Sequence, residues 1–182
     1  MKMDARIIYT KNMIKETFLN LLDKAPPDKI TVTKICENAE INRSTFYKYY
    51  TDPYDLMQQL EDETLEKLHT LAENSNTKSM EHILLLILNE IQANKKYYYR
   101  LFYRQDIHVF HEKLILMCCQ VINPQISTRK RFSSLKEQEW FYYFIIQGCS
   151  YILDCWIRDG MPDDISRVAG FIGKMYDELM NG

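Results

Sequence analysis

Glycine and proline are scarce in this sequence of 182 residues, with five of each, and no glycine occurs before Gly148. Tight turns between strands rely on these residue types, so their scarcity argues against a fold rich in β-hairpins. Apolar residues instead recur at every third or fourth position over long segments, which is typical of amphipathic helices. These features predict an all-α protein with about nine helices.

Long apolar runs, a CxxC spacing and a large excess of one charge are also missing. The longest uninterrupted apolar runs, at residues 83–88 and 140–146, are far shorter than the roughly 20 residues of a membrane-spanning helix. The N-terminus shows no signal-peptide pattern, so a cytoplasmic location is expected. The five cysteines are odd in number and lack metal-ligand spacing, which favours reduced thiols and predicts neither a metal nor a cofactor.

The net charge of −2 does not by itself indicate a nucleic-acid partner, so the distribution of charge matters more. Residues 1–52 contain nine Lys or Arg and seven Asp or Glu, a net charge of +2. Residues 53–182 contain fourteen and eighteen, a net charge of −4. The small basic excess therefore lies at the N-terminal end of the chain.

The start of the chain is expected to form three helices. Apolar residues at helical spacing predict the first over residues 5–24, and a pair of prolines follows it. Thr31 is a good N-cap for a short second helix, and Asn42 for a third over about residues 43–50. Two short helices separated by a tight break resemble a helix-turn-helix unit, whose last helix enters the major groove of DNA.

The third expected helix has one polar face and one mostly aromatic face. A step of 100° per residue places four residues on the polar arc, namely Arg43, Ser44, Tyr47 and Lys48. The opposite arc contains Thr45, Phe46, Tyr49 and Tyr50. Arginine can donate two hydrogen bonds to guanine, and the other polar residues can contact bases or phosphates. From this pattern alone, an ordinary amphipathic surface helix remains an alternative.

Residues 30–56 closely resemble the DNA-binding motif of the TetR family of bacterial regulators, and the segment Thr45-Phe46-Tyr47-Lys48-Tyr49-Tyr50 carries its most specific part. The resemblance implies that Thr33, Arg43, Ser44 and Tyr47 face bases or their backbone and that Thr45, Lys48 and Tyr49 hold phosphates. The full set expected at the DNA interface is Thr33, Asn42, Arg43, Ser44, Thr45, Tyr47, Lys48 and Tyr49.

Two residues depart from the family pattern. Glu40 stands where the turn of the motif usually has glycine, so a residue that resists positive φ must make this turn. Pro53 replaces the usual lysine at the start of the fourth helix, which removes a phosphate contact. The first change predicts local strain or a slightly altered turn, and the second predicts modest affinity for DNA.

The expected organisation is a DNA-binding domain at residues 1–52 and a helical effector-binding and dimerisation domain at residues 53–182. Later helices are expected near residues 80–94, 97–105, 107–122, 136–159 and 164–180. The last two resemble the family's dimerisation helices, with interface candidates Tyr143, Ile152, Trp156, Gly170 and Gly173. Packing within one chain is the alternative role for the two glycines.

The family commonly binds a small-molecule effector in the helical body. Five aromatic residues are candidates for lining such a pocket, namely Tyr98, Phe102, Tyr103, Phe110 and Phe144, and a place in the core is the alternative for them. Taken together, the sequence predicts a homodimeric regulator, expected to be a repressor, that binds a near-palindromic operator of double-stranded DNA. A co-regulator that acts through another protein remains the second hypothesis, and no catalytic motif supports an enzyme.

Overall fold

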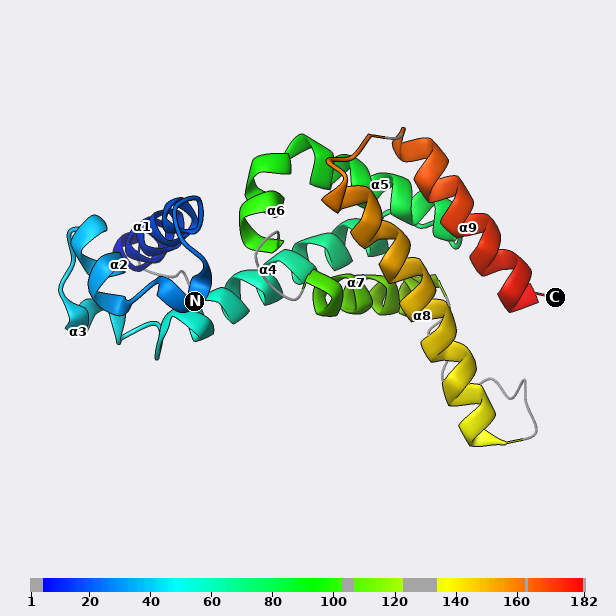
Figure 1. Cartoon of the computed structure of the whole chain (residues 1–182), viewed down its shortest axis with the longest axis horizontal. Helices are drawn as coiled ribbons and strands as arrows, with labels where there is room; N and C mark the ends of the chain where they lie inside the picture. The colour runs from blue at the N-terminus through cyan, green and yellow to red at the C-terminus, as the bar shows by residue number, and fades with distance from the viewer. Residues whose placement is uncertain (1–4, 103–106, 123–133, 163, 182) are drawn as a thin grey trace. The chain divides into compact units, whose positions relative to one another are not determined.

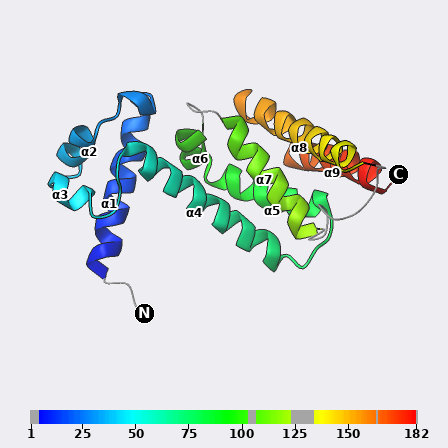
Figure 2. The same cartoon turned by 90° about the horizontal axis from the view of Figure 1, so that it is seen from below.

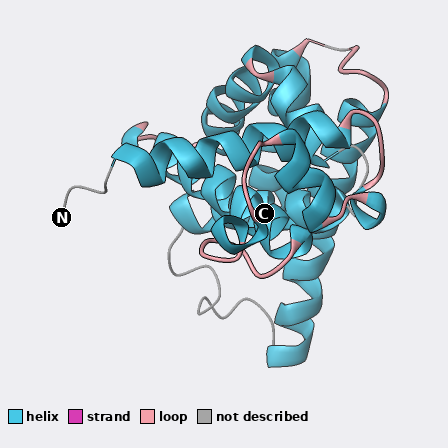
Figure 3. Ribbon diagram, turned by 90° about the vertical axis from the view of Figure 1, so that its left-hand side faces the viewer, coloured by secondary structure: helices cyan, strands magenta, loops and turns pink. Residues whose placement is uncertain are grey.

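The structure is a computed structural model that describes residues 5–102, 107–122, 134–162 and 164–181. Over these residues it contains nine α-helices, one short 3-10 helix and no strand (Figure 3). The helices are α1 (Ala5–Leu22), η1 (Pro27–Lys29), α2 (Val32–Asn38), α3 (Arg43–Phe46), α4 (Pro53–Asn74), α5 (Met80–Ala93), α6 (Lys95–Phe102), α7 (Ile107–Ile122), α8 (Leu135–Arg158) and α9 (Ile165–Asn181). The prediction of an all-α protein is confirmed.

The chain separates into two compact units, and the division differs from the expected domain boundary after residue 52. The first unit extends to Thr64 and also includes the segment that begins at Lys96, whereas the second contains Leu65–Lys95 and the helices α7 to α9. The physical reason is that α6 packs on the first unit. Arg100 on α6 donates from Nε to Oδ1 of Asp23 over 2.9 Å, and the hydroxyls of Tyr97 and Thr64 share a hydrogen bond of 2.8 Å.

In the first unit, α1, α2 and α3 surround a small apolar core (Figure 1). The side chains of Ile14, Phe18, Ile35 and Phe46 are fully buried there. The helical spacing of Ile14 and Phe18 explains why α1 presents one apolar face to the other two helices. Thr31 caps α2 as expected, because its side chain accepts a hydrogen bond from the amide of Lys34.

A strong cap begins α4 at Pro53. Oδ1 of Asp52 accepts hydrogen bonds from the amides of Tyr54 and Asp55 at 2.7 and 2.9 Å. Asp55 in turn accepts a 2.7 Å hydrogen bond from the amide of Thr51, which lowers the pKa of the Asp55 carboxyl. These contacts fix the direction in which the chain leaves α3 and enters α4.

In the second unit, α5 packs along α9 and α7 packs along α8, while α8 and α9 lie side by side (Figure 2). The core of this unit includes Ile83, Leu84, Ile87 and Leu88 from α5, all fully buried. A reciprocal capping box between Ser134 and Glu137 begins α8. In the part of the chain that the structure describes, we find no candidate for a membrane-spanning helix.

Candidate nucleic-acid interface

The turn between α2 and α3 is closed by a residue with positive φ. Glu40 has φ of 52°, and the amide of Ile41 donates to the carbonyl of Cys36 over 3.0 Å. This six-residue turn is a Schellman type of helix end, in which glycine is usual at the position that Glu40 occupies. The expectation that Glu40 makes this turn in spite of its side chain is therefore confirmed, and its backbone is strained.

α3 is shorter than the sequence predicts, because it ends at Phe46 instead of continuing to residue 50. The amides of Tyr49 and Tyr50 both donate to the carbonyl of Phe46, so the chain continues as a tight turn. Asn42 occupies the N-cap position, but its side chain caps no amide. Oδ1 of Asn42 instead accepts a 3.3 Å hydrogen bond from the hydroxyl of Thr45.

The aromatic underside of α3 holds it against the rest of the first unit. Phe46 and Tyr50 are both buried, and their ring centroids lie 5.6 Å apart. Nζ of Lys11 on α1 lies 5.8 Å from the centroid of the Tyr50 ring, which is within the range of a cation–π contact. Burial raises the pKa of Tyr50, so its hydroxyl stays neutral.

The outer face of α3 and the turn after it present the residues predicted to contact DNA. Arg43, Ser44, Tyr47 and Lys48 are exposed, as is Asn42, and 56% of Tyr47 is accessible to solvent. Thr33, Thr45 and Tyr49 are partly exposed. The structure thus leaves every residue of the predicted set at least partly accessible to solvent.

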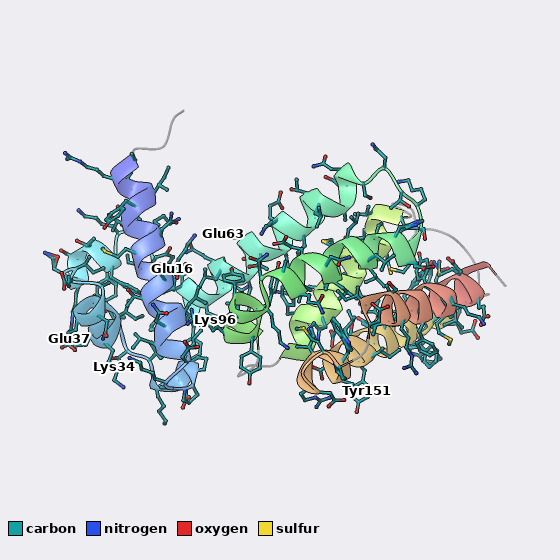
Figure 4. All side chains as sticks on the ribbon, turned by 90° about the horizontal axis from the view of Figure 1, so that it is seen from above. Glu16, Lys34, Glu37, Glu63, Lys96 and Tyr151 are labelled. Atoms are coloured by element: carbon teal, nitrogen blue, oxygen red, sulfur yellow. The ribbon has the colours of Figure 1, made fainter. Side chains whose placement is uncertain are left out.

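One contact joins the two helices of the motif directly. Nη2 of Arg43 donates a hydrogen bond to Oγ1 of Thr33 at 2.5 Å. The residues are ten positions apart, so helical periodicity could not reveal this pair. Lys34 and Glu37 are also exposed on α2 (Figure 4), and Nζ of Lys34 donates to the carbonyl of Lys29 over 3.1 Å.

The sequence also did not reveal how α6 is held in the first unit. Figure 4 labels Glu16, Glu63 and Lys96, which come from α1, α4 and α6. The pKa of Tyr97 is raised mainly by burial, and the carboxylates of Glu63 and Glu16 raise it further. Tyr97 is therefore a neutral hydrogen-bonding residue that links α6 to α4 through Thr64.

The predicted effector-pocket residues have different environments. Tyr98 in the first unit and Phe110 in the second are buried, whereas 67% of Phe144 is exposed on α8. Tyr103 and the side chain of Phe102 lie outside the described residues. The second unit has a groove of about 260 Å³ between α7 and α8, which contains none of these five residues and is lined by Leu116, Cys119, Glu139, Tyr142, Tyr143, Ile145 and Ile146.

The predicted interface residues also differ in exposure. Trp156 is only 4% exposed within a single chain, and Ile152 is half-buried. At Gly173 an added Cβ would lie 2.8 Å from Cβ of Glu81 on α5, so this glycine permits close packing within the chain. Tyr143 is exposed, as are four other aromatic residues on α8 and α9, namely Trp140, Phe144, Tyr151 and Phe171.

Polar groups and thiols are buried in the second unit. Nδ1 of His111 lies 3.7 Å from Oδ1 of Asp154, whose other oxygen lies 3.3 Å from Arg158. Burial raises the pKa of Cys119 to about 12 and that of Cys149 to about 11. Among the described residues, no group of three or more His, Cys, Asp or Glu side chains can hold a metal ion.

Three comparisons relate these features to known proteins. Residues 78–178 match the TetR family model described as "Transcriptional regulator C-terminal region". The activator of the dhaKLM operon, DhaS, of Lactococcus lactis is 27% identical over 95 residues, which are 52% of this chain. That match spans 50% of the length of DhaS.

Two solved structures share the fold over nearly the whole chain. A TetR regulator of Streptococcus agalactiae has a TM-score of 0.72 at 20% identity and covers 94% of this chain and 96% of its own. The dihydroxyacetone kinase operon activator DhaS has a TM-score of 0.60 at 20% identity. The match covers 96% of this chain and 97% of the DhaS chain. Because the matched family model spans more than half of the sequence, the chain belongs to the TetR family of transcriptional regulators.

Proposed function

We propose that this protein binds a near-palindromic DNA operator as a homodimer and thereby regulates transcription. The observation that carries the proposal is the exposed face of Arg43, Tyr47 and Lys48 above the buried rings of Phe46 and Tyr50. A rigid aromatic underside allows the polar residues to enter the major groove as a unit. This function places the protein in the cytoplasm with the chromosome.

Each exposed residue has a distinct role in this proposal. Arg43 reads a guanine through paired hydrogen bonds, and Ser44 contacts an adjacent base edge. Lys48 and the Tyr47 hydroxyl hold phosphates, and the partly exposed Tyr49 does so while its ring packs against Tyr50, 6.5 Å away. Phosphate contacts supply affinity for any sequence, whereas Arg43 supplies preference for one sequence.

The exposed aromatic residues of α8 support the proposal of a homodimer. Trp140, Phe144 and Tyr151 are each more than half exposed, and their spacing of four and seven residues puts them on one side of the helix. Figure 4 shows Tyr151 pointing outward from α8. A second copy would cover this surface and present two recognition helices to half-sites about one helical turn apart.

Gel-shift titrations with fragments of the upstream genomic DNA test this function. We expect a shifted dimer complex whose affinity falls steeply as salt rises. Arg43→Ala should lose the preference for the bound fragment, and Lys48→Ala should weaken binding to all fragments alike. Lys67→Ala, at an exposed lysine of α4 in the second unit, is the matched control. Equal binding of every fragment by wild type and Arg43→Ala would refute the role of Arg43.

The proposal includes release of the operator by a small-molecule effector, which would shift the population of binding-competent dimers. Repression follows if the bound operator overlaps a promoter. The Lactococcus lactis relative is named as an activator, so a reporter gene in cells with and without the protein decides the direction. Higher reporter expression without the protein indicates repression, and lower expression indicates activation.

A protein-interaction co-regulator is the second candidate function. Asp52 occupies the first two free amides of α4, and Pro53 provides neither an amide donor nor a charged side chain. The first unit therefore has fewer groups for phosphate at this helix start than the family pattern provides. Absence of any shifted complex at low salt, with the protein folded and dimeric, would favour this candidate over DNA binding.

A further inference from the structure

We infer that Thr33 is a positioning residue for Arg43: its hydroxyl holds the guanidinium in place before DNA arrives, so that the remaining donors meet the base edge. This inference rests on the proposed function, because it assumes that Arg43 reads a base. It goes beyond that function because Thr33 on α2 then affects DNA recognition through Arg43 on α3, instead of making a separate contact with DNA.

The geometry of the pair carries the inference. Nη2 of Arg43 donates to Oγ1 of Thr33 at 2.5 Å, and Arg43 nevertheless remains exposed. Thr33 lies in the first turn of α2 and is half-buried, so its position is set by the packing of that helix. The bond therefore ties a long, flexible side chain to a rigid element.

The electrostatics of Cys36 agree with the contact between Arg43 and Thr33. Cys36 lies three residues after Thr33 and is buried. The pKa of its thiol is raised mainly by burial, and the positive charge of Arg43 acts against that rise, ahead of the opposing effect of Glu37. The positive charge of Arg43 therefore acts on a thiol one helical turn along α2 from Thr33, as the hydrogen bond to Thr33 leads us to expect.

Arginine has five N–H donors in a planar fork, and a guanine edge requires two of them. One donor given to Thr33 therefore leaves enough for the base. A free arginine side chain loses much rotational freedom when it binds, and a side chain that is already held loses less. A hydroxyl also leaves the positive charge of Arg43 uncompensated for the DNA, which a carboxylate partner would not do.

The strained turn at Glu40 contributes to the same arrangement. The hydrogen bond from the amide of Ile41 to the carbonyl of Cys36 fixes how α3 follows α2. Asn42, next in the chain, is held by the hydroxyl of Thr45. The carbonyl of Arg43 also accepts a hydrogen bond of 2.9 Å from the amide of Tyr47. The backbone of Arg43 is thus held within α3, and the contact with Thr33 fixes the far end of its side chain.

The test uses the full chain and a selected duplex in which one base pair is recognised by wild type but not by Arg43→Ala. Thr33→Val removes the hydroxyl and keeps the shape of the side chain, and Thr33→Ser is the matched control that keeps the hydroxyl. We expect Thr33→Val to lose about fivefold in discrimination at that base pair, as for one net hydrogen bond, and Thr33→Ser to stay close to wild type.

A double-mutant cycle decides whether Thr33 acts through Arg43. In the Arg43→Ala background, Thr33→Val should have no further effect on binding. The contrary result is that Thr33→Val lowers the affinity equally in the wild-type and Arg43→Ala backgrounds, or equally for every DNA sequence. Either outcome would mean that Thr33 contacts DNA itself and would overturn the inference. Tighter binding by Thr33→Val would also overturn it, because the contact would then hold Arg43 away from DNA.

NMR relaxation of the Arg43 side-chain N–H in the free protein gives an answer that needs no DNA. We expect this group to be ordered in wild type and in Thr33→Ser, and mobile in Thr33→Val. Mobility in wild type would overturn the inference even if the protein binds its operator. Failure of wild type to bind any duplex, with Arg43 ordered, would instead refute the proposed function and leave the contact in place.

Discussion

Where α5 and α9 pack together, replacing glycine by alanine should have opposite effects on the free energy of unfolding at two glycines about one helical turn apart. At Gly173 an added Cβ would lie 2.8 Å from Cβ of Glu81 and 3.0 Å from its backbone nitrogen. At Gly170 the nearest atom is Oε1 of the Glu81 side chain, at 3.6 Å. Backbone near Gly173 must therefore move for a methyl group to fit, whereas the space at Gly170 already accepts one.

The magnitudes follow from these distances. Replacing glycine by alanine inside a helix stabilises it by about 1 kcal/mol, and overpacking of a fixed contact costs about 2 kcal/mol. Gly170→Ala should therefore raise the free energy of unfolding by about 1 kcal/mol. Gly173→Ala should lower it by about 1 kcal/mol, so that the two variants differ by about 2 kcal/mol.

Urea unfolding followed by tryptophan fluorescence measures this difference. Both tryptophans of the chain, Trp140 and Trp156, lie in α8 of the second unit, and the buried Trp156 reports its unfolding. All variants should be measured at one protein concentration, because dimer formation would shift the apparent stability. Equal stabilisation by both substitutions would refute the close approach of α5 and α9 at Gly173.

Three other measurements test separate parts of the structure. Glu40→Gly should be about 1 kcal/mol more stable than Glu40→Ala in thermal unfolding, because only glycine relieves the positive φ; equal stabilities would contradict the strained turn. Asp52→Ala should lower the free energy of unfolding by about 1 kcal/mol through loss of the cap on α4, and an unchanged value would contradict that cap. Cys119 and Cys149 have raised pKa values, so at pH 8 iodoacetamide should label them only after unfolding; rapid labelling of the native protein, located by mass spectrometry, would be the contrary result.

Local signals allowed much of the helical structure to be predicted. Thr31 and Asp52 occupy N-cap positions and accept hydrogen bonds from helix amides as such residues do elsewhere. The end of α3 was predicted wrongly, because the i, i+4 spacing of Phe46 and Tyr50 suits a helix and a tight turn equally well. The spacing of apolar residues indicates which face is buried, but it does not indicate at which residue the helix ends.

Contacts between distant residues could not be predicted from the sequence. Asp23 and Arg100 are 77 positions apart, and no local pattern indicates that α6 packs on the first unit. Phe144 was a candidate for a pocket or the core, but it is exposed on α8. An apolar stripe on a helix has the same spacing whether it packs inside the chain or against a partner.

Selection of bound duplexes from a random DNA pool tests the reading role of α3 most directly. The account predicts that the purified protein enriches duplexes with two symmetry-related half-sites about one helical turn apart, each with a guanine that Arg43→Ala no longer selects. Enrichment of no sequence, or the same enriched sequences for wild type and Arg43→Ala, would contradict it.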